Sequence, residues 1–388
     1  MTDSLISILE NQLDDYLDDL RILVSIDSGS NYKTGVDRVN EWLEARLISL
    51  GFTVKRDLQT KNGDNLLAAL EGRGSGRILL LGHSDTVFPV GTAAERPMTI
   101  AGDRIHGPGT CDMKAGLLTG CYAAAALSEL GFQDFGRIDF LCVSDEEVQE
   151  RYSHELIRRT ARQADAVFTL EAARENGDIV IARKGVQVYE IEAFGHAAHA
   201  GVEPEKGCNA ILALAHQCIK LDQLNGFRPD VTVNLGVFEG GSQPNVVPDY
   251  ARLLVDLRAF TKEDLQAVVE AAHEIIKEEP FPGIKMRMKQ VGHGHEPMPY
   301  TPEAAALEAL ARQAADELGF SVNGAWTGGA SDASLAAGEG KPVLDGLGPI
   351  GGLDHSPDEY ILLSSIVPRT ALLARLIIAV ANKEKEQP

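Results

Sequence analysis

The sequence predicts an α/β protein in which a mostly parallel sheet domain is interrupted by an inserted ferredoxin-like domain. Short apolar runs at 77–82, 137–143 and 166–170 are rich in Ile, Leu, Val and Phe, which is typical of strands buried on both faces of a parallel sheet. The pattern changes near residue 185, and the first pattern returns after about residue 296. Strands that alternate with helices indicate the α/β class.

The first segment, residues 1–184, contains most elements of the sheet domain. "DMKAGLLTGCYAAAALSELG" lies between the first two apolar runs, and its Ala and Leu content predicts a helix that Gly131 closes at its C-terminus. The stretch "MTDSLISILENQLDDYLDDL" at the N-terminus indicates an acidic amphipathic helix. It lacks a basic region and a small-residue cleavage site, so we expect no signal peptide.

The inserted segment, residues 185–295, predicts the element order β-α-β-β-α-β, which is that of a ferredoxin-like unit. The strands correspond to "VQVYEIEAFG", "VTVNLGVF", "YARLLVDLRAF" and "GIKMRMKQV", and the helices to "CNAILALAHQCIKLDQL" and "KEDLQAVVEAAHEIIKEE". A helix over 302–318 and a strand near "PVLDGL" then return the chain to the sheet domain, whose second part is residues 296–388.

Composition disfavours several classes of protein. The formal net charge is −21, from 36 Lys and Arg against 57 Asp and Glu, which disfavours nucleic acid and anionic membranes as partners. No apolar run approaches the roughly 20 residues that span a bilayer. Five cysteines without paired spacing favour reduced thiols, and hence a cytoplasmic protein. At 388 residues the chain exceeds what one compact core usually serves, which agrees with two domains.

Side chains able to bind a metal follow the predicted strands or precede the long helix. They are His83, Asp112, Glu146, Glu147, Glu171 and His355. The carboxyl ends of parallel strands lie along one edge of a sheet, where ligand crevices form, so we expect these side chains to meet there. Taken alone, each has an ordinary explanation: His83 as a buried histidine beside a solvated Asp85, and Asp112 as a helix cap. Glu146 and Glu147 could likewise form a solvated turn.

The types of side chain point to a metal. Two imidazoles and three or four carboxylates, without clustered cysteines, suit one or two divalent ions, zinc foremost. Two Zn²⁺ ions carry four positive charges, which three carboxylates and a bridging hydroxide would bring near neutrality. A further carboxylate outside the coordination sphere could then act as a general base.

Seven motifs occur in order along the chain: "GHSDTV", "GPGTCDMKAG", "SDEE", "TLEAA", "HAAHAG", "TGGASDAS" and "GGLDHSPDEY". On these motifs the chain resembles the dinuclear zinc hydrolases that include glutamate carboxypeptidase (carboxypeptidase G), acetylornithine deacetylase, succinyl-diaminopimelate desuccinylase and aminoacylase. The resemblance covers nearly the whole chain and is closest to the glutamate carboxypeptidase branch. It implies a zinc-peptidase catalytic domain, with the inserted segment as a lid and dimerisation domain.

By this resemblance the enzyme binds two zinc ions per subunit. Asp112 bridges the two ions. His83 and Glu171 hold one ion, and Glu147 and His355 hold the other.

The resemblance also implies the catalytic roles near the metals. Glu146 is the general base, and Asp85 orients His83 through its second ring nitrogen. The peptide bond between Asp112 and Met113 is expected to be cis, which aims both carboxylate oxygens at the two metals.

In the inserted domain the resemblance assigns His199 in "HAAHAG" to the oxyanion of the partner subunit's site, which implies a homodimer. His196 fits the family pattern less well, and the alternative for His199 is a histidine that ends a strand. Asn245 and Arg258 match positions that bind a substrate carboxylate or the oxyanion region, and Gly329 would let the backbone approach the substrate. An arginine suits a carboxylate because it can donate two parallel hydrogen bonds, although a strand-edge ion pair is the alternative for Arg258.

Three functions remain open at this stage. The first is a zinc carboxypeptidase that cleaves an amide bond next to a free amino-acid carboxylate. The second is an N-acyl or N-carbamoyl amino acid amidohydrolase, and the third is a metal-free binding or scaffold protein. Arg183 and Lys184 in "IARKGV" depart from the glutamate carboxypeptidase branch, so glutamate specificity does not follow. These two cations could add positive charge near the hinge between the domains or pair with surface acids, and we expect the second.

Overall fold

The computed structural model describes residues 2–149 and 152–383. The chain forms two compact units. Unit 1 comprises Met1–Ile181, Tyr300–Trp326 and Ser331–Pro388, and unit 2 comprises Ala182–Pro299 and Thr327–Ala330. Unit 2 therefore contains the segment expected as an insertion, together with a short loop that the sequence pattern assigned to the sheet domain.

A six-stranded sheet forms the centre of unit 1, in the order β1-β2-β6-β3-β7-β14. The strands are β1 (Thr53–Asp57), β2 (Asn65–Glu71), β3 (Arg77–His83), β6 (Arg137–Val143), β7 (Ala166–Thr169) and β14 (Val343–Leu344). β6, β3, β7 and β14 run parallel, whereas β1 and β2 add an antiparallel edge. The predicted α/β class with a mostly parallel sheet is confirmed.

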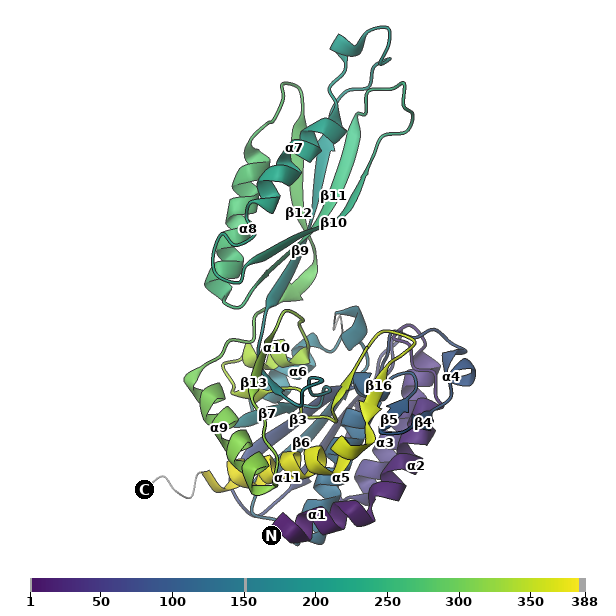
Figure 1. Cartoon of the computed structure of the whole chain (residues 1–388), viewed down its shortest axis with the longest axis vertical. Coiled ribbons are helices and arrows are strands. Elements are labelled where there is room, and N and C mark those ends of the chain that lie inside the picture. The colour runs from purple at the N-terminus through teal and green to yellow at the C-terminus, as the bar shows by residue number, and fades with distance from the viewer. Residues whose placement is uncertain (1, 150–151, 384–388) are drawn as a thin grey trace. The chain divides into compact units, whose positions relative to one another are not determined.

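Helices cover both faces of this sheet (Figure 1). One layer contains α1 (Thr2–Asn11), α2 (Leu13–Val24), α3 (Lys33–Ser49), α5 (Ala115–Glu129), α9 (Pro302–Glu317) and α11 (Ile366–Lys383). The opposite layer contains α6 (His154–Ala161) and α10 (Asp332–Ala337). Because both faces are covered, successive residues of β3 from Ile78 to His83 are all buried, which explains why this strand is a continuous apolar run.

The N-terminal segment forms two helices rather than the single helix expected. α1 and α2 are separated at Gln12, whose backbone has φ −95° and ψ 0°. Both helices bury their apolar residues: Leu5 and Leu9 of α1 belong to the main core, and Tyr16 of α2 donates a hydrogen bond to the Ala115 carbonyl at 2.7 Å. The break lets each helix follow its own part of the core surface.

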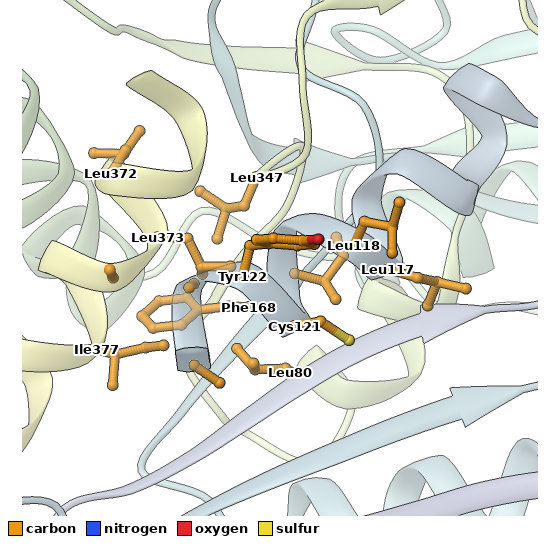
Figure 2. Close-up of a cluster of buried hydrophobic side chains, with 14 of the residues drawn as sticks. Leu80, Leu117, Leu118, Cys121, Tyr122, Phe168, Leu347, Leu372, Leu373 and Ile377 are labelled. Carbon is orange, nitrogen blue, oxygen red and sulfur yellow. The ribbon is translucent and has the colours of Figure 1, made fainter. Parts of the chain in front are cut away.

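Helix α5 lies at the centre of the unit 1 core, and twelve of its residues are buried on all sides. In Figure 2, Leu117, Leu118, Cys121 and Tyr122 of α5 lie among Leu80, Phe168, Leu347 and the α11 residues Leu372, Leu373 and Ile377. The backbone at Leu170, directly after β7, lies close against α5. A Cβ atom at Gly116 would be only 1.8 Å from the Leu170 carbonyl oxygen, so the helix needs a glycine at this position. The helix ends as expected at Gly131, which has φ +68°.

Helix α11 belongs to the same core. Within the described chain, Leu363–Asn382 is the one helical stretch long and apolar enough to cross a membrane, with a mean hydropathy of 1.6. Of its most apolar part, 67% is buried inside the protein. Its contacts with α5, α9 and α1 explain its apolar character as that of a core helix.

A second, small sheet in unit 1 was not predicted. It is antiparallel, in the order β15-β16-β5-β4, with β4 (Thr99–Ala101), β5 (Arg104–His106), β15 (Gly351–Gly352) and β16 (Tyr360–Leu362). Tyr360 of β16 pairs with His106 of β5, so the loop after β5 lies beside the loop before β16. The remaining elements outside the inserted segment are α4 (Thr92–Glu95), β8 (Ile179–Arg183) and β13 (Gly324–Thr327), with β8 and β13 paired.

Unit 2 has the ferredoxin-like element order that the sequence predicts. Its elements are β9 (Gly185–Phe194), α7 (Ala210–Asp222), β10 (Thr232–Gly240), β11 (Tyr250–Ala259), α8 (Lys262–Lys277) and β12 (Lys285–His295). The strands form an antiparallel sheet in the order β10-β11-β9-β12. α7 and α8 contact each other and cover one face of this sheet (Figure 1). Asn209 and Thr261 cap the two helices by accepting hydrogen bonds from Leu212 N and Asp264 N.

We expect replacement of Leu373 by alanine to destabilise unit 1. Leu373 is fully buried among the side chains drawn in Figure 2, so its truncation leaves a cavity that costs about 2–5 kcal/mol. Both tryptophans, Trp42 and Trp326, belong to unit 1, so denaturant unfolding followed by tryptophan fluorescence reports on this unit. Leu58→Ala is the control, because Leu58 is 75% exposed and its truncation should change stability by less than about 0.5 kcal/mol. Equal effects of the two changes would contradict this packing.

Candidate active site

Three neighbouring strands end at one edge of the unit 1 sheet. His83 is the last residue of β3. Glu146 and Glu147 begin a short 3-10 turn after β6, and Glu171 follows β7. Because β3 lies between β6 and β7, the structure brings these four side chains to one region.

Asp112 comes to the same region from the loop that precedes α5. The peptide bond between Asp112 and Met113 is cis, so that prediction is confirmed. Asp112 Oδ1 lies 2.8 Å from His83 Nε2, and Asp112 Oδ2 lies 3.0 Å from His355 Nε2. His355 is in the loop between β15 and β16 and has a left-handed backbone, with φ +61°. One carboxylate therefore lies between two imidazoles, and each imidazole faces a different oxygen.

The potential ligands form two groups that share Asp112. The first consists of His83, Asp112 and Glu171, and the second of Asp112, Glu147 and His355; within each, the ligand atoms lie within 4.8 Å of one another. Glu171 Oε1 is 3.6 Å from His83 Nε2, and Glu147 Oε2 is 3.1 Å from His355 Nε2. Two metal positions joined by a shared carboxylate fit this arrangement.

The two histidines differ in their exposure to water. The His83 side chain is 1% exposed, whereas that of His355 is 51% exposed. Asp112 lies between these extremes at 16%. The two imidazoles thus differ: His83 is buried, and His355 faces solvent, whereas the side chains of Glu171 and Glu147 are 14% and 5% exposed.

The carboxylates strongly perturb the titration of their neighbours. Hydrogen bonds to Asp112 and Glu147 raise the pKa of His355 to about 11. Burial acts to lower the pKa of His83, but Asp112 and Asp85 outweigh it and raise that pKa well above its usual value. Burial raises the pKa of Glu146 well above its usual value, and nearby carboxylates act in the same direction. Negative charge thus exceeds what two imidazoles can balance.

This donor set fits divalent metal ions. Imidazole nitrogens and carboxylate oxygens, without sulfur, suit zinc and similar ions. Glu147 Oε1 is buried and has no hydrogen-bond partner among the described residues, as expected of an oxygen that belongs to a metal site. A cation at each group would supply the missing positive charge. The roles of the individual ligands stay predictions.

Asp85 joins the strand that bears His83 to the turn that bears the two glutamates. Its backbone carbonyl oxygen is 3.0 Å from His83 Nδ1, closer than its carboxylate oxygen Oδ1 at 3.4 Å. The fully buried carboxylate accepts hydrogen bonds from the Ser30 hydroxyl at 2.6 Å and from the backbone N–H groups of Glu146 and Glu147 at 3.3 Å. With a metal bound, a proton held on Nδ1 would leave the Nε2 lone pair of His83 for the metal. Asp85 can therefore orient the histidine, with its backbone oxygen as the nearest acceptor.

Sequence reasoning missed Glu359, which holds the loop of Asp112. Its buried carboxylate accepts hydrogen bonds from the backbone N–H groups of Gly109 at 3.0 Å, Cys111 at 2.7 Å and Asp112 at 3.0 Å. Burial raises the pKa of Glu359 to about 7, although these three hydrogen bonds act to lower it. The signal that could have found it is its place in the motif "GGLDHSPDEY", four residues after His355.

Lys114 is a second buried charge behind the same loop. Its Nζ donates a hydrogen bond to the Ile26 carbonyl at 2.8 Å, and burial lowers its pKa to about 8. The Lys114 stem also passes close to Gly109, where a Cβ atom would lie 3.2 Å from it, and Gly109 has φ +75°. Glycine at this position thus satisfies both the backbone conformation and the space.

The structure places His199 and Asn245 on neighbouring loops of unit 2. Ala200 N donates to the Asn245 carbonyl at 3.0 Å, and His199 pairs with Val246 as an isolated bridge. The His199 ring is exposed, and its Nδ1 accepts a hydrogen bond from Gly201 N at 3.1 Å. Its proton is therefore held on Nε2, which is left as a donor. His196 is also exposed but pairs with Cys208 instead.

The other two substrate-binding candidates of unit 2 also lie together. Arg258 makes two hydrogen bonds to Asp256, at 2.8 and 2.9 Å, and a third to the Gly328 carbonyl at 2.6 Å. Gly329 accepts a hydrogen bond from Arg183 Nη1 at 3.0 Å. The ion pair considered as the alternative for Arg258 is thus present. These three hydrogen bonds use three of the five N–H groups of the guanidinium. Its role toward a substrate stays a prediction.

Arg183 and Lys184 do not lie on the surface, so their interpretation as surface ion pairs is wrong. They are 5% and 9% exposed. Lys184 Nζ lies 5.4 Å from the centre of the Phe260 ring, and burial lowers its pKa. Their stems pack inside unit 2, which a charge pattern alone does not reveal.

Comparisons with known proteins identify the family of the chain. Residues 79–379 match peptidase family M20/M25/M40. The chain belongs to this family. Carboxypeptidase G2 of Pseudomonas sp. (strain RS-16) is 31% identical over 92% of this chain and 88% of its own length. Acetylornithine deacetylase of Myxococcus xanthus is 25% identical over 92% of this chain and 94% of its own length.

Solved structures of peptidases share the fold. The aminopeptidase PepT from Bacillus cereus has a TM-score of 0.81 at 26% identity, over 95% of this chain and 99% of that one. An M20 family metallo-carboxypeptidase from Sulfolobus solfataricus has a TM-score of 0.73 at 18% identity, over 94% and 99%. The chain is an enzyme of a metallopeptidase and amidohydrolase family, so the alternative of a metal-free scaffold is set aside.

We expect Glu359→Gln to weaken metal binding by this M20-family enzyme without unfolding it. Glutamine has one acceptor oxygen where the carboxylate has two, so at least one backbone N–H of the Asp112 loop loses its partner. Groups that position ligands in this way typically change metal affinity by about 10- to 100-fold.

Competitive zinc titration measures the effect, and Glu308→Gln serves as the control. Glu308 is also buried, at 5% exposure, but binds Tyr300 and Arg312 away from the site. Unchanged zinc affinity in folded Glu359→Gln protein would show that the loop does not depend on this carboxylate.

Proposed function

We propose that this enzyme hydrolyses an amide bond next to a free amino-acid carboxylate, as a carboxypeptidase of the glutamate carboxypeptidase type with two zinc ions per subunit. The observation that carries the proposal is the sharing of Asp112 between two groups of metal-binding side chains. The similarity to carboxypeptidase G2 over 92% of the chain supports the reaction type. Zinc bound at these groups would polarise the substrate carbonyl and acidify a water.

The chain's own residues then have separate tasks. His83 and Glu171 would hold one ion, Glu147 and His355 the other, and Asp112 both. Glu146 lies outside both groups, next to them in the turn after β6. We assign it the proton of the attacking water, which it passes to the leaving amine.

The raised pKa of Glu146 supports this assignment. A general base works best when its pKa is near the working pH, and burial moves this carboxyl in that direction. A cation bound nearby would lower the pKa of Glu146 again, so burial and the cation together determine this pKa. Glu147, one residue further on, points to His355 and is assigned to the metal instead.

A second candidate is an amidohydrolase that removes an N-acyl or N-carbamoyl group from an amino acid. It uses the same metal ligands and the same base. The similarity to acetylornithine deacetylase over 92% of the chain supports it as an alternative. The two candidates differ in the group on the acyl side of the cleaved bond.

We further propose that His199 donates a hydrogen bond to the oxyanion in the partner subunit's site, so that the active form is a homodimer. The hydrogen bond from Gly201 N to Nδ1 supports this role, because it leaves the Nε2–H free to donate. Asn245 on the adjoining loop and Arg258 with Gly329 are the proposed substrate contacts. All five cysteines are free, which supports a reducing, cytoplasmic location.

Substitution of the two adjacent glutamates should separate base from ligand. Glu146→Gln should retain zinc but lose roughly 10²-fold or more in turnover, because the proton carrier is gone while the ligands stay. Glu147→Gln should lose both zinc and activity. Metal analysis and kcat on N-acyl amino acids and dipeptides measure both effects. Loss of zinc from Glu146→Gln, or near-normal turnover by it, would reverse or remove the assignment.

A mixing experiment tests whether His199 acts across the dimer. His199→Ala should be folded, zinc-loaded and about 10²- to 10³-fold slower, as expected for loss of one oxyanion donor. Because His196 pairs with a different segment, His196→Ala is the control and should be mild. Glu146→Gln and His199→Ala proteins, each inactive, are then mixed under conditions that exchange subunits. Activity should return, since one hybrid site has both residues intact; heterodimers without activity would contradict a role across the interface.

A further inference from the structure

A pocket of about 520 Å³ opens beside Glu147 in unit 1. Its described walls come from three segments: residues 29–32, residues 86–90, and Glu147 with Val148. The volume is within the range of sites that bind small molecules. Because Glu147 also belongs to the second metal-binding group, the pocket begins at the candidate active site.

The pocket walls are mainly apolar. Tyr32, Val87, Phe88, Val90 and Val148 supply most of the large side chains. The hydroxyl of the lining residue Ser30 is already used, because it donates to Asp85 at 2.6 Å. Among the described lining residues Glu147 is the only charged one, so no described cation faces the pocket.

Backbone hydrogen bonds and a cation–π contact fix the segments that form the apolar wall. Ser30 N donates to the Thr86 carbonyl at 3.2 Å, and Thr86 N donates to the Ser28 carbonyl at 2.9 Å, which joins two of the three segments. Phe88 is 9% exposed, and the Arg96 guanidinium lies 4.7 Å from the centre of its ring. Val87 and Val90 remain 41% and 61% exposed. A fixed pocket thus leaves apolar surface that a ligand would cover.

We infer that this pocket binds the acyl side of the cleaved bond and selects apolar acyl groups, aromatic or branched aliphatic. This inference rests on the proposed function and adds its substrate class. A substrate of that function carries a free carboxylate on its amine side. Away from the proposed zinc ions, a carboxylate in this pocket would lie against apolar side chains without a described cation, which is costly, whereas an uncharged acyl group gains by burial.

We expect kcat/KM to rise with the area of the apolar wall that the acyl group covers and to fall if the acyl group is charged. A phenylacetyl group would cover Val87, Val90 and Phe88, an acetyl group would be too short to cover them, and a succinyl group would bring a charge to an apolar wall. One apolar group in a hydrophobic pocket is worth about 10- to 200-fold in discrimination. We therefore expect kcat/KM for phenylacetyl derivatives to exceed that for acetyl and succinyl derivatives of the same amino acid by about 10-fold or more.

The test compares zinc-loaded wild type, Val90→Asp and Leu58→Asp on acetyl, phenylacetyl and succinyl derivatives of the amino acid that the wild type releases fastest. Val90 is a mostly exposed lining residue, so its replacement should not unfold the protein. Leu58 is 75% exposed and does not line the pocket, which makes it the matched control. Val90→Asp should lower kcat/KM for the phenylacetyl derivative about 10-fold and leave the acetyl derivative within about 3-fold.

Binding of phenylacetate to the zinc-loaded protein, measured by calorimetry, provides a readout that does not need turnover, because its carboxylate would face the zinc ions while its phenyl group enters the pocket. Wild type and Leu58→Asp should bind it, and Val90→Asp should bind it at least 10-fold more weakly. If wild type prefers the acetyl or succinyl derivative, or if Val90→Asp changes neither selectivity nor phenylacetate binding, the inference is wrong while the proposed function stands. If the zinc-loaded wild type cleaves no member of the panel or of a dipeptide set, the proposed function fails, and the inference fails with it.

Discussion

The arrangement of the site depends on one carboxylate held between two imidazoles. Asp112 faces His83 with one oxygen and His355 with the other, at 2.8 and 3.0 Å. These histidines lie far apart in the sequence, one at the end of a sheet strand and the other in a loop of the small antiparallel sheet. Asp112 can join them only if its own loop is fixed in both position and direction.

The rest of unit 1 provides that fixation. Helix α5, which starts three residues after Asp112, is buried on all sides between the large sheet and α11, as Figure 2 shows. Glu359 accepts three backbone hydrogen bonds from the loop itself. The strand that leads into the loop, β5, pairs with β16, which directly follows Glu359. Because α5, the hydrogen bonds to Glu359 and strand β5 all fix this loop, Asp112 can stay close to other carboxylates despite their repulsion. Metal ions would offset that cost, because they bring positive charge to a region rich in carboxylates.

Much of this was predictable from sequence because buried parallel strands appear as apolar runs and end at a common edge. The residues after β3, β6 and β7 follow directly from that rule, as does the order of elements in unit 2. The small sheet was missed because its strands have only two or three residues and owe their pairing to distant segments. The role of Glu359 was missed for a related reason: an acceptor of backbone N–H groups has no spacing that reveals its partners. The burial of Arg183 and Lys184 was misjudged because charge suggests exposure, whereas their stems pack inside the protein.

We propose that two metal ions share Asp112. Diffraction from crystals of the zinc-loaded protein, recorded on both sides of the zinc absorption edge, tests this directly. We expect two anomalous peaks about 3.5–4 Å apart, one at each oxygen of Asp112, with His83 at the first and His355 at the second. A single peak, or two peaks of which only one contacts Asp112, would contradict it.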